Sequence, residues 1–251
     1  MKTFFLAQYP LIGTKHKPAA LHLMQRSPYY WWWAYLRRNA EYIACCERGG
    51  KGKLSKLYAD FGDVRSDDFR TWWGVSLRRG QLLFAERHKD LKLIQLATKD
   101  EWLDEWNADA EVAVFAVNLT IGRRKLQQYF AQMLSRLHTG KRGRPSVGKA
   151  GVSTALYPLH RNFSQHNLRA MLDTYDAWFA NQQLPKKEQV ALWTIGDRLK
   201  VVPSAVSKKT DTPSELTAKH NVMSVAVHRY VKQAKAIVAN TAKGQFPNSV
   251  T

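Results

Sequence analysis

Six aromatic side chains stand within the seven residues from Tyr29 to Tyr35, and this run constrains the fold more than any other feature of the chain. Ser27 and Pro28 come directly before it, which is the pattern of a helix N-cap followed by proline at the first helical position. We therefore expect a helix over residues 27–48. Its expected apolar face comprises Tyr29, Trp32, Trp33, Leu36, Tyr42 and Ile43.

Two interpretations of these rings are open. One buried stripe needs fewer aromatic side chains, so the run favours a helix that is buried on two sides. The alternative is that some of the rings, together with Trp72 and Trp73, are platforms on which unpaired nucleic-acid bases stack.

The composition indicates a folded protein. Of 251 residues, 45% are hydrophobic and nine are tryptophan, which excludes a disordered basic arm. No apolar run approaches the roughly 20 residues that span a bilayer, and the start of the chain does not have the pattern of a secretory signal. The only cysteines, Cys45 and Cys46, are adjacent, so we expect no disulfide framework or zinc site. These features indicate a cytoplasmic protein without a membrane partner.

Short apolar runs predict strands in the first part of the chain. They are residues 81–85, 91–97 and 111–119, of which the last is the strongest. A small helix is expected around Trp102 and Trp106, and an amphipathic helix with a basic start over residues 123–138. The predicted fold class is α+β. We divide the chain into an α+β domain rich in tryptophan over residues 1–138, a basic linker over 139–153 and a mainly helical domain over 154–251.

The last third of the chain carries clear helix signals. Apolar residues recur at helical spacing from Leu168 to Phe179, and Pro185 ends that pattern. Thr212 and Glu215 form a capping box, from which a helix could extend to about Asn240. An alternative is a second helix-turn-helix with its turn at Asn221, but His220 at a position that should be apolar favours one continuous helix. Gly244 and Pro247 are expected to end the ordered structure.

A short basic motif lies in the expected linker. Its residues are Lys141, Arg142, Gly143, Arg144 and Pro145, with Lys149 extending the positive charge. This motif resembles the AT-hook of chromatin architectural proteins. The resemblance implies that Arg142 and Arg144 enter the minor groove of A·T-rich duplex DNA, where glycine permits close approach. The alternative is a solvated basic linker between two domains.

Residues 192–209 resemble a helix-turn-helix of the bacterial repressor type, in which the second helix lies in the major groove. Ile195, Leu199, Val201 and Val206 occupy the apolar positions, and Gly196 stands where the two helices approach. Lys200 and Lys209 depart from the pattern, because the turn usually has glycine and the mini-core another apolar residue. The resemblance implies that Ser204, Ser207 and Lys208 contact bases or phosphates and that Lys209 contacts the backbone. The alternative is an ordinary pair of helices.

The charge of the whole chain favours a polyanionic partner. Lys and Arg number 39 against 20 Asp and Glu, a formal net charge of +19. The polar side of the expected last helix contributes to this excess, and we assign phosphate contacts to Arg229 and Lys232 there. The other basic residues on that side are Lys219, His220, His228 and Lys235.

The sequence offers little for catalysis. Asp60, Asp63, Asp67 and Asp68 form an acidic cluster, which could hold Mg²⁺ in a nuclease but which we interpret as a solvated loop balancing nearby arginines. No histidine pair stands at the spacing of a zinc hydrolase. We therefore expect no catalytic residues, no metal and no cofactor.

These patterns predict a non-enzymatic protein that binds duplex DNA, in the manner of a bacterial or phage transcriptional regulator or an accessory factor for DNA rearrangement. The first alternative is a single-stranded DNA-binding or RNA-binding subunit of a nucleoprotein complex, and the second is an assembly factor that binds acidic protein surfaces. A metal-dependent nuclease is the third. No heptad pattern assigns an oligomeric interface.

Overall fold

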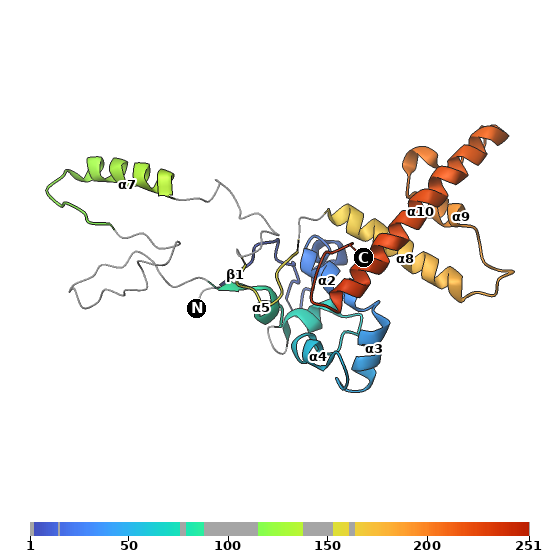
Figure 1. Ribbon diagram of the computed structural model, residues 1–251, viewed down its shortest axis with the longest axis horizontal. Helices are drawn as coiled ribbons and strands as arrows, with labels where there is room; N and C mark the ends of the chain where they lie inside the picture. Colours follow the sequence, from blue (N-terminus) through green and yellow to red (C-terminus); the bar gives the residue numbers. More distant parts are fainter. Residues whose placement is uncertain are drawn as a thin grey trace. The chain divides into compact units, whose positions relative to one another are not determined.

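The computed structural model describes residues 3–14, 16–75, 79–87, 115–137, 153–160 and 164–250 (Figure 1). These residues are mostly helical. Their only strands are β1 (Thr3–Phe4) and β2 (Glu86–Arg87), which pair antiparallel. The predicted α+β class is therefore wrong. The helices of the N-terminal part are α1 (Leu21–Met24), α2 (Pro28–Leu36), α3 (Ala40–Glu47), α4 (Ser55–Phe61), the π-helix η1 (Thr71–Val75) and α5 (Arg79–Phe84).

The chain forms two compact units, and they do not follow the expected division. The main unit consists of residues 2–87 and 146–251, and the smaller unit of residue 1 and residues 88–145. The main unit's C-terminal part contains α8 (Gln165–Gln183), α9 (Leu192–Leu199), the 3₁₀ helix η3 (Pro203–Ala205) and α10 (Pro213–Thr241). A boundary at residues 139–153 would cut through one shared core, because both ends of the chain contribute to it.

Helix α2 lies at the centre of this core. Ser27 caps it through a hydrogen bond that its hydroxyl accepts from the Tyr29 N–H (3.3 Å), and Pro28 is the first helical residue, as predicted. All nine residues of the helix are buried. The Tyr35 hydroxyl donates to the backbone carbonyl of Leu168 in α8 (2.9 Å), and burial raises the pKa of Tyr35. The interpretation of the aromatic run as a buried helix is therefore confirmed.

Trp32 shows how the segments converge on α2. Its side chain is fully buried, and its ring packs against aromatic rings from four segments far apart in the sequence. These neighbours are Phe61 of α4, Phe84 of α5, Tyr157 and Phe246, with ring centroids 5.2 to 6.0 Å from that of Trp32. The helix is aromatic on every side because it has neighbours on every side.

The helix expected over residues 27–48 is two helices. The break falls at residues 37–39, because Asn39 caps α3 by accepting a hydrogen bond from the Tyr42 N–H (2.9 Å). The same Asn39 side chain donates to the carbonyl of Val238 in α10 (3.0 Å). Arg38, next to it, binds both carboxylate oxygens of Asp176 in α8 (3.1 and 2.6 Å). The residues between α2 and α3 therefore connect the N-terminal helices to α8 and α10.

The strands expected in the first part of the chain are not found where the structure can test them. Residues 81–84 belong to α5, whose Gly80, Leu83 and Phe84 are buried at helical spacing, whereas Leu82 is 70% exposed. Residues 115–119 form no strand. Residues 91–97, 111–114, Trp102 and Trp106 lie outside the described residues. A short apolar run cannot by itself distinguish a strand from a buried helix, and here packing on Trp73 decides for the helix.

The C-terminal helices agree better with the sequence. Helix α8 and the break after it are confirmed, as is the capping box at Thr212 and Glu215. Helix α10 is 29 residues long and continues past Asn221 without interruption. The expectation that order ends at Gly244 and Pro247 is wrong, because Phe246 is fully buried in the core and Asn240 holds the tail through hydrogen bonds to the carbonyls of residues 248 and 250.

In the smaller unit the structure describes residues 115–137. The predicted amphipathic helix is present as α7 (Arg123–Leu137), and none of its residues is buried. Phe130 on this helix packs edge-on against Phe115 with ring centroids 5.4 Å apart.

Candidate nucleic-acid interface

The second helix of the expected helix-turn-helix does not form. After α9, residues 203–205 make only one turn of 3₁₀ helix, and the next α-helix begins at Pro213. Two backbone N–H groups that a recognition helix would use bond to side chains instead: that of Ser207 donates to Asp197 (2.8 Å) and that of Lys208 to Asp211 (2.6 Å). The major-groove helix predicted to start at Ser204 is therefore corrected to a loop, residues 200–212, which we call the basic connection.

Helix α9 packs on α10 rather than on a recognition helix. Ile195 is fully buried, and a Cβ atom on Gly196 would lie 2.3 Å from the Met223 side chain and 2.8 Å from that of Val227. The prediction that Gly196 marks a close approach of helices is confirmed, with α10 as the partner. Lys200 adopts the left-handed conformation (φ 52°, ψ 43°) that glycine usually supplies after such a helix.

His220 of α10 fastens the middle of the basic connection. Its ring stacks on that of Trp193 in α9, with centroids 3.7 Å apart and an interplanar angle of 12°. Its Nε2 atom lies 3.4 Å from the hydroxyl oxygen of Ser207. This explains the polar residue at a helix position that should be apolar, because the ring is sandwiched between α9 and the connection.

Asp211 fastens the end of the basic connection. Its carboxylate accepts hydrogen bonds from the Lys208 N–H and from Lys219 Nζ, both at 2.6 Å, and the Lys219 bond is the largest cause of its lowered pKa. Glu215 accepts from the N–H and hydroxyl of Thr212 in the capping box, which lowers its pKa as well. Both carboxylates are thus engaged in holding the chain.

The structure separates the predicted contact residues of this region. Lys208 and Lys209 are exposed on the basic connection, and so is Ser204. Ser207 is half-buried and makes the internal contacts with Asp197 and His220, so it is not available to read bases. Arg229 and Lys232 are exposed on α10, as expected. Lys141, Arg142, Gly143, Arg144 and Lys149 lie outside the described residues.

The surface from the end of α8 to the end of α10 has a large cationic excess. Residues 184–243 contain eleven Lys and Arg against four Asp and Glu. Three of the four carboxylates, those of Asp197, Asp211 and Glu215, accept the internal hydrogen bonds just described. Of these eleven cations, only Lys219 forms an ion pair within the described part of the chain. The other ten form no ion pair there.

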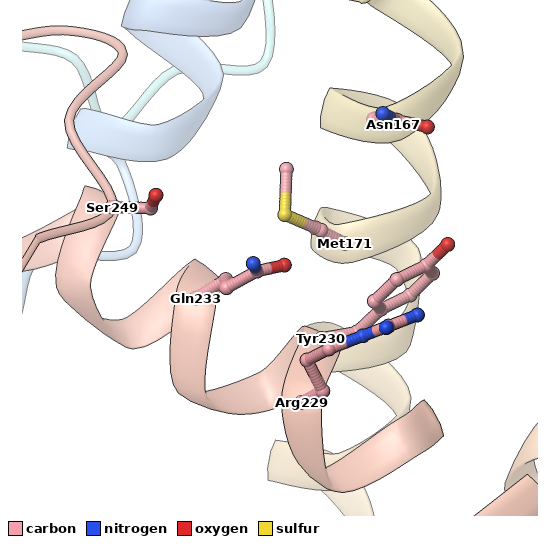
Figure 2. A pocket seen from close by; sticks show the side chains of 6 residues that line it. All are labelled: Asn167, Met171, Arg229, Tyr230, Gln233 and Ser249. Carbon is pink, nitrogen blue, oxygen red and sulfur yellow. The ribbon is translucent and has the colours of Figure 1, made fainter. Parts of the chain in front are cut away.

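Figure 2 shows a cavity of about 310 Å³ between α8, α10 and the C-terminal tail. The Met171 side chain lies between the two helices, and the Arg229 guanidinium lies 5.6 Å from the centre of the Tyr230 ring. The lining residues are Asn167, Met171, Arg229, Tyr230, Gln233 and Ser249. A guanidinium beside two carboxamides suits a small anion such as a phosphate group.

A second hollow, of about 380 Å³, adjoins the same two helices. Trp178 of α8 and Lys235 of α10 meet there, with Lys235 Nζ 3.8 Å from the centre of the indole ring. Its other lining residues are His228, Val231 and Lys232. The sequence pattern placed Trp178 and Phe179 together at the end of one apolar helix face, and it gave no signal that these rings reach the surface.

The aromatic residues proposed as stacking platforms in the N-terminal part are not accessible. Each residue from Tyr29 to Trp33, and also Trp72 and Trp73, is 9% exposed or less. Base stacking on these rings is therefore excluded in this structure, and any stacking must use rings elsewhere.

The acidic cluster is engaged in structural contacts. Asp60 accepts a hydrogen bond from the Tyr157 hydroxyl (2.5 Å), and burial together with this carboxylate raises the Tyr157 pKa. Asp63 pairs with Arg65, which lowers the pKa of the carboxyl, and Asp67 pairs with Arg37. Asp68 accepts hydrogen bonds from Thr71. The described residues contain no group of three or more His, Cys, Asp or Glu side chains that could hold a metal ion.

The chain matches no protein-family model, no curated protein and no solved structure. None of the described helices has both the length and the apolar character of a membrane span.

Proposed function

We propose that the protein binds DNA without catalysing a reaction, and that it holds the phosphate backbone with the basic connection and the exposed cations of α10. The observation that carries this proposal is the cationic excess of residues 184–243, in which the carboxylates Asp197, Asp211 and Glu215 are engaged internally while ten of eleven cations have no ion pair within the described residues. Such a surface attracts a polyanion and releases its counterions on binding.

The basic connection is suited to this role because it is already ordered. Asp197, His220 and Asp211 hold its backbone, while Lys208 and Lys209 remain exposed. Binding therefore does not have to order the loop, so less conformational entropy opposes it.

Contacts of this kind favour binding without strong sequence preference. Phosphate contacts position a protein on DNA, whereas base contacts specify the sequence, and the helix expected to read bases is absent from residues 203–209. An accessory factor for DNA rearrangement therefore fits this surface better than a sequence-specific repressor. Within the proposal, Arg142 and Arg144 remain the sequence-based prediction for a preference for A·T-rich duplex.

The proposal is tested by the salt dependence of duplex binding. The variant Lys208→Gln/Lys209→Gln should weaken binding and reduce the slope of log K against log salt by about 1–2, since each lost phosphate contact removes about 0.9 from the slope. Lys51→Gln/Lys53→Gln is the matched control and should leave the slope unchanged, because it removes two exposed lysines from the loop between α3 and α4, outside residues 184–243. Equal slopes for wild type and the first variant would contradict the proposal and favour the assembly factor.

Arg142→Ala/Arg144→Ala separates the minor-groove prediction from the rest. It should reduce the preference for A·T-rich over G·C-rich duplex while the contribution of Lys208 and Lys209 persists. An unchanged preference would show that the AT-hook-like motif does not contribute to binding and would leave the basic connection as the proposed site.

A further inference from the structure

The hollow between Trp178 and Lys235 combines an aromatic wall with positive charge. Lys232, Lys235 and His228 surround it from α10, and Trp178 closes it from α8. All three α10 side chains are exposed, and Trp178 is half-buried. In this respect the hollow differs from the N-terminal aromatic core, where each residue from Tyr29 to Trp33 is 9% exposed or less.

The aromatic wall extends beyond the hollow along α8. The Tyr175 ring lies 6.0 Å from that of Trp178 and 6.1 Å from that of Phe179, and with Phe179 it is nearly parallel, at 22°. Phe179 is 50% exposed. Exposed aromatic rings beside lysines are the combination by which proteins bind unpaired nucleotides, because bases stack on the rings and phosphates meet the cations.

The hollow lies on the same flank of α10 as the basic connection. Asn221, His228, Lys232 and Lys235 follow one another at intervals of seven, four and three residues, which places them in one stripe of an α-helix. His220, which holds the connection, lies 11 residues, or about three helical turns, before Val231 of the hollow, which places these two residues on the same side of α10. At 1.5 Å per residue the distance from His220 to Lys235 is about 22 Å, or about six nucleotide steps of B-form DNA.

We propose that this hollow binds an unpaired nucleotide of a DNA strand that continues from the duplex on the basic connection. Lys235 Nζ, which lies 3.8 Å from the centre of the indole ring, moves to a phosphate, and the base packs on Trp178 in its place. His228 and Lys232 lie near the neighbouring phosphates. This inference rests on the proposed function and adds to it that the preferred substrate is duplex DNA with a single-stranded extension.

The test compares three DNA molecules by fluorescence anisotropy: a blunt duplex, the same duplex with a tail of about six thymidines, and the same tail without bases. We expect the thymidine tail to raise affinity about tenfold, or about 1.4 kcal/mol, because one base of the tail stacks on Trp178. The abasic tail should lose most of this gain, since it keeps the phosphates and removes the stacking partner.

Trp178→Ala should abolish the gain from the tail and leave affinity for the blunt duplex unchanged, whereas Trp178→Phe should keep most of the gain. Thermal unfolding of both variants establishes that the fold is intact. If the blunt duplex binds but Trp178→Ala retains the full gain, or the abasic tail binds as well as the thymidine tail, the hollow is not a nucleotide site. If the wild-type protein does not bind the blunt duplex in a salt-dependent manner, the proposed function itself fails.

Discussion

The buried carboxylate of Glu86 accepts hydrogen bonds from both the backbone N–H (2.5 Å) and the hydroxyl (3.0 Å) of Thr154. Ser153 and Ala155 donate to the same carboxylate, at 2.6 and 3.2 Å. Glu86 lies near the end of the first segment of the main unit, and residues 153–155 lie near the start of its second segment. One side chain thus joins the two segments of the main unit.

Glu86→Ala should destabilise the main unit by about 2 kcal/mol, because several donors lose their acceptor at once. For a chain of this size that corresponds to a fall in the unfolding temperature of about 4–8 °C, which differential scanning calorimetry can measure. Glu188→Ala, at an exposed glutamate, is the control and should change the unfolding temperature by less than about 2 °C. Equal effects of the two substitutions would show that the contact does not hold the two segments together.

Gly196→Ala should displace α9 from α10. The added Cβ would meet Met223 and Val227 at distances well below van der Waals contact, so we expect a loss of about 1–3 kcal/mol in the free energy of unfolding. DNA binding should weaken as well, since the basic connection is attached to both helices. Gly122→Ala, where a Cβ has no atom within 4 Å, serves as the control in the same denaturant titration. A stable variant with unaltered binding would contradict the packing described for α9.

The contact between Asp211 and the basic connection should depend on pH. Hydrogen bonds from Lys219 and from the Lys208 N–H lower the folded-state pKa of Asp211, so its contribution is complete above the unfolded value of about 3.9 and is lost as pH falls through the lowered folded value. The NMR shift of the Lys208 amide proton should therefore change with a midpoint below about 3.9. Asp211→Asn should remove this transition; its persistence in that variant would assign it to another group.

Local patterns determined the elements whose boundaries depend on a few adjacent residues. Ser27 and Pro28 start α2, and Thr212 and Glu215 start α10, because a cap needs only the residues within one turn. The periodicity of apolar residues likewise predicted α7 and α8 correctly. The abundance of rings in α2 was enough to indicate burial on more than one side.

Tertiary packing decided what the local patterns left open. Residues 81–84 could have been a strand, but Gly80 and Phe84 pack on Trp73 as a helix. Residues 203–209 have the composition of a recognition helix. However, two of their backbone N–H groups donate hydrogen bonds to the side chains of Asp197 and Asp211 instead of to helical carbonyls. In both cases the deciding partner lies in another element, and its position cannot be read from residues nearby.

Composition and short-range spacing are enough to predict that this chain is folded, strongly basic and built around a buried aromatic helix. That both ends of the chain share one core, and which cations and rings remain on its surface, follows from the three-dimensional arrangement alone. The physical reason is that burial depends on contacts between distant segments: Trp32 is enclosed by rings from four of them, whereas Trp178 stands beside Lys235 at the surface.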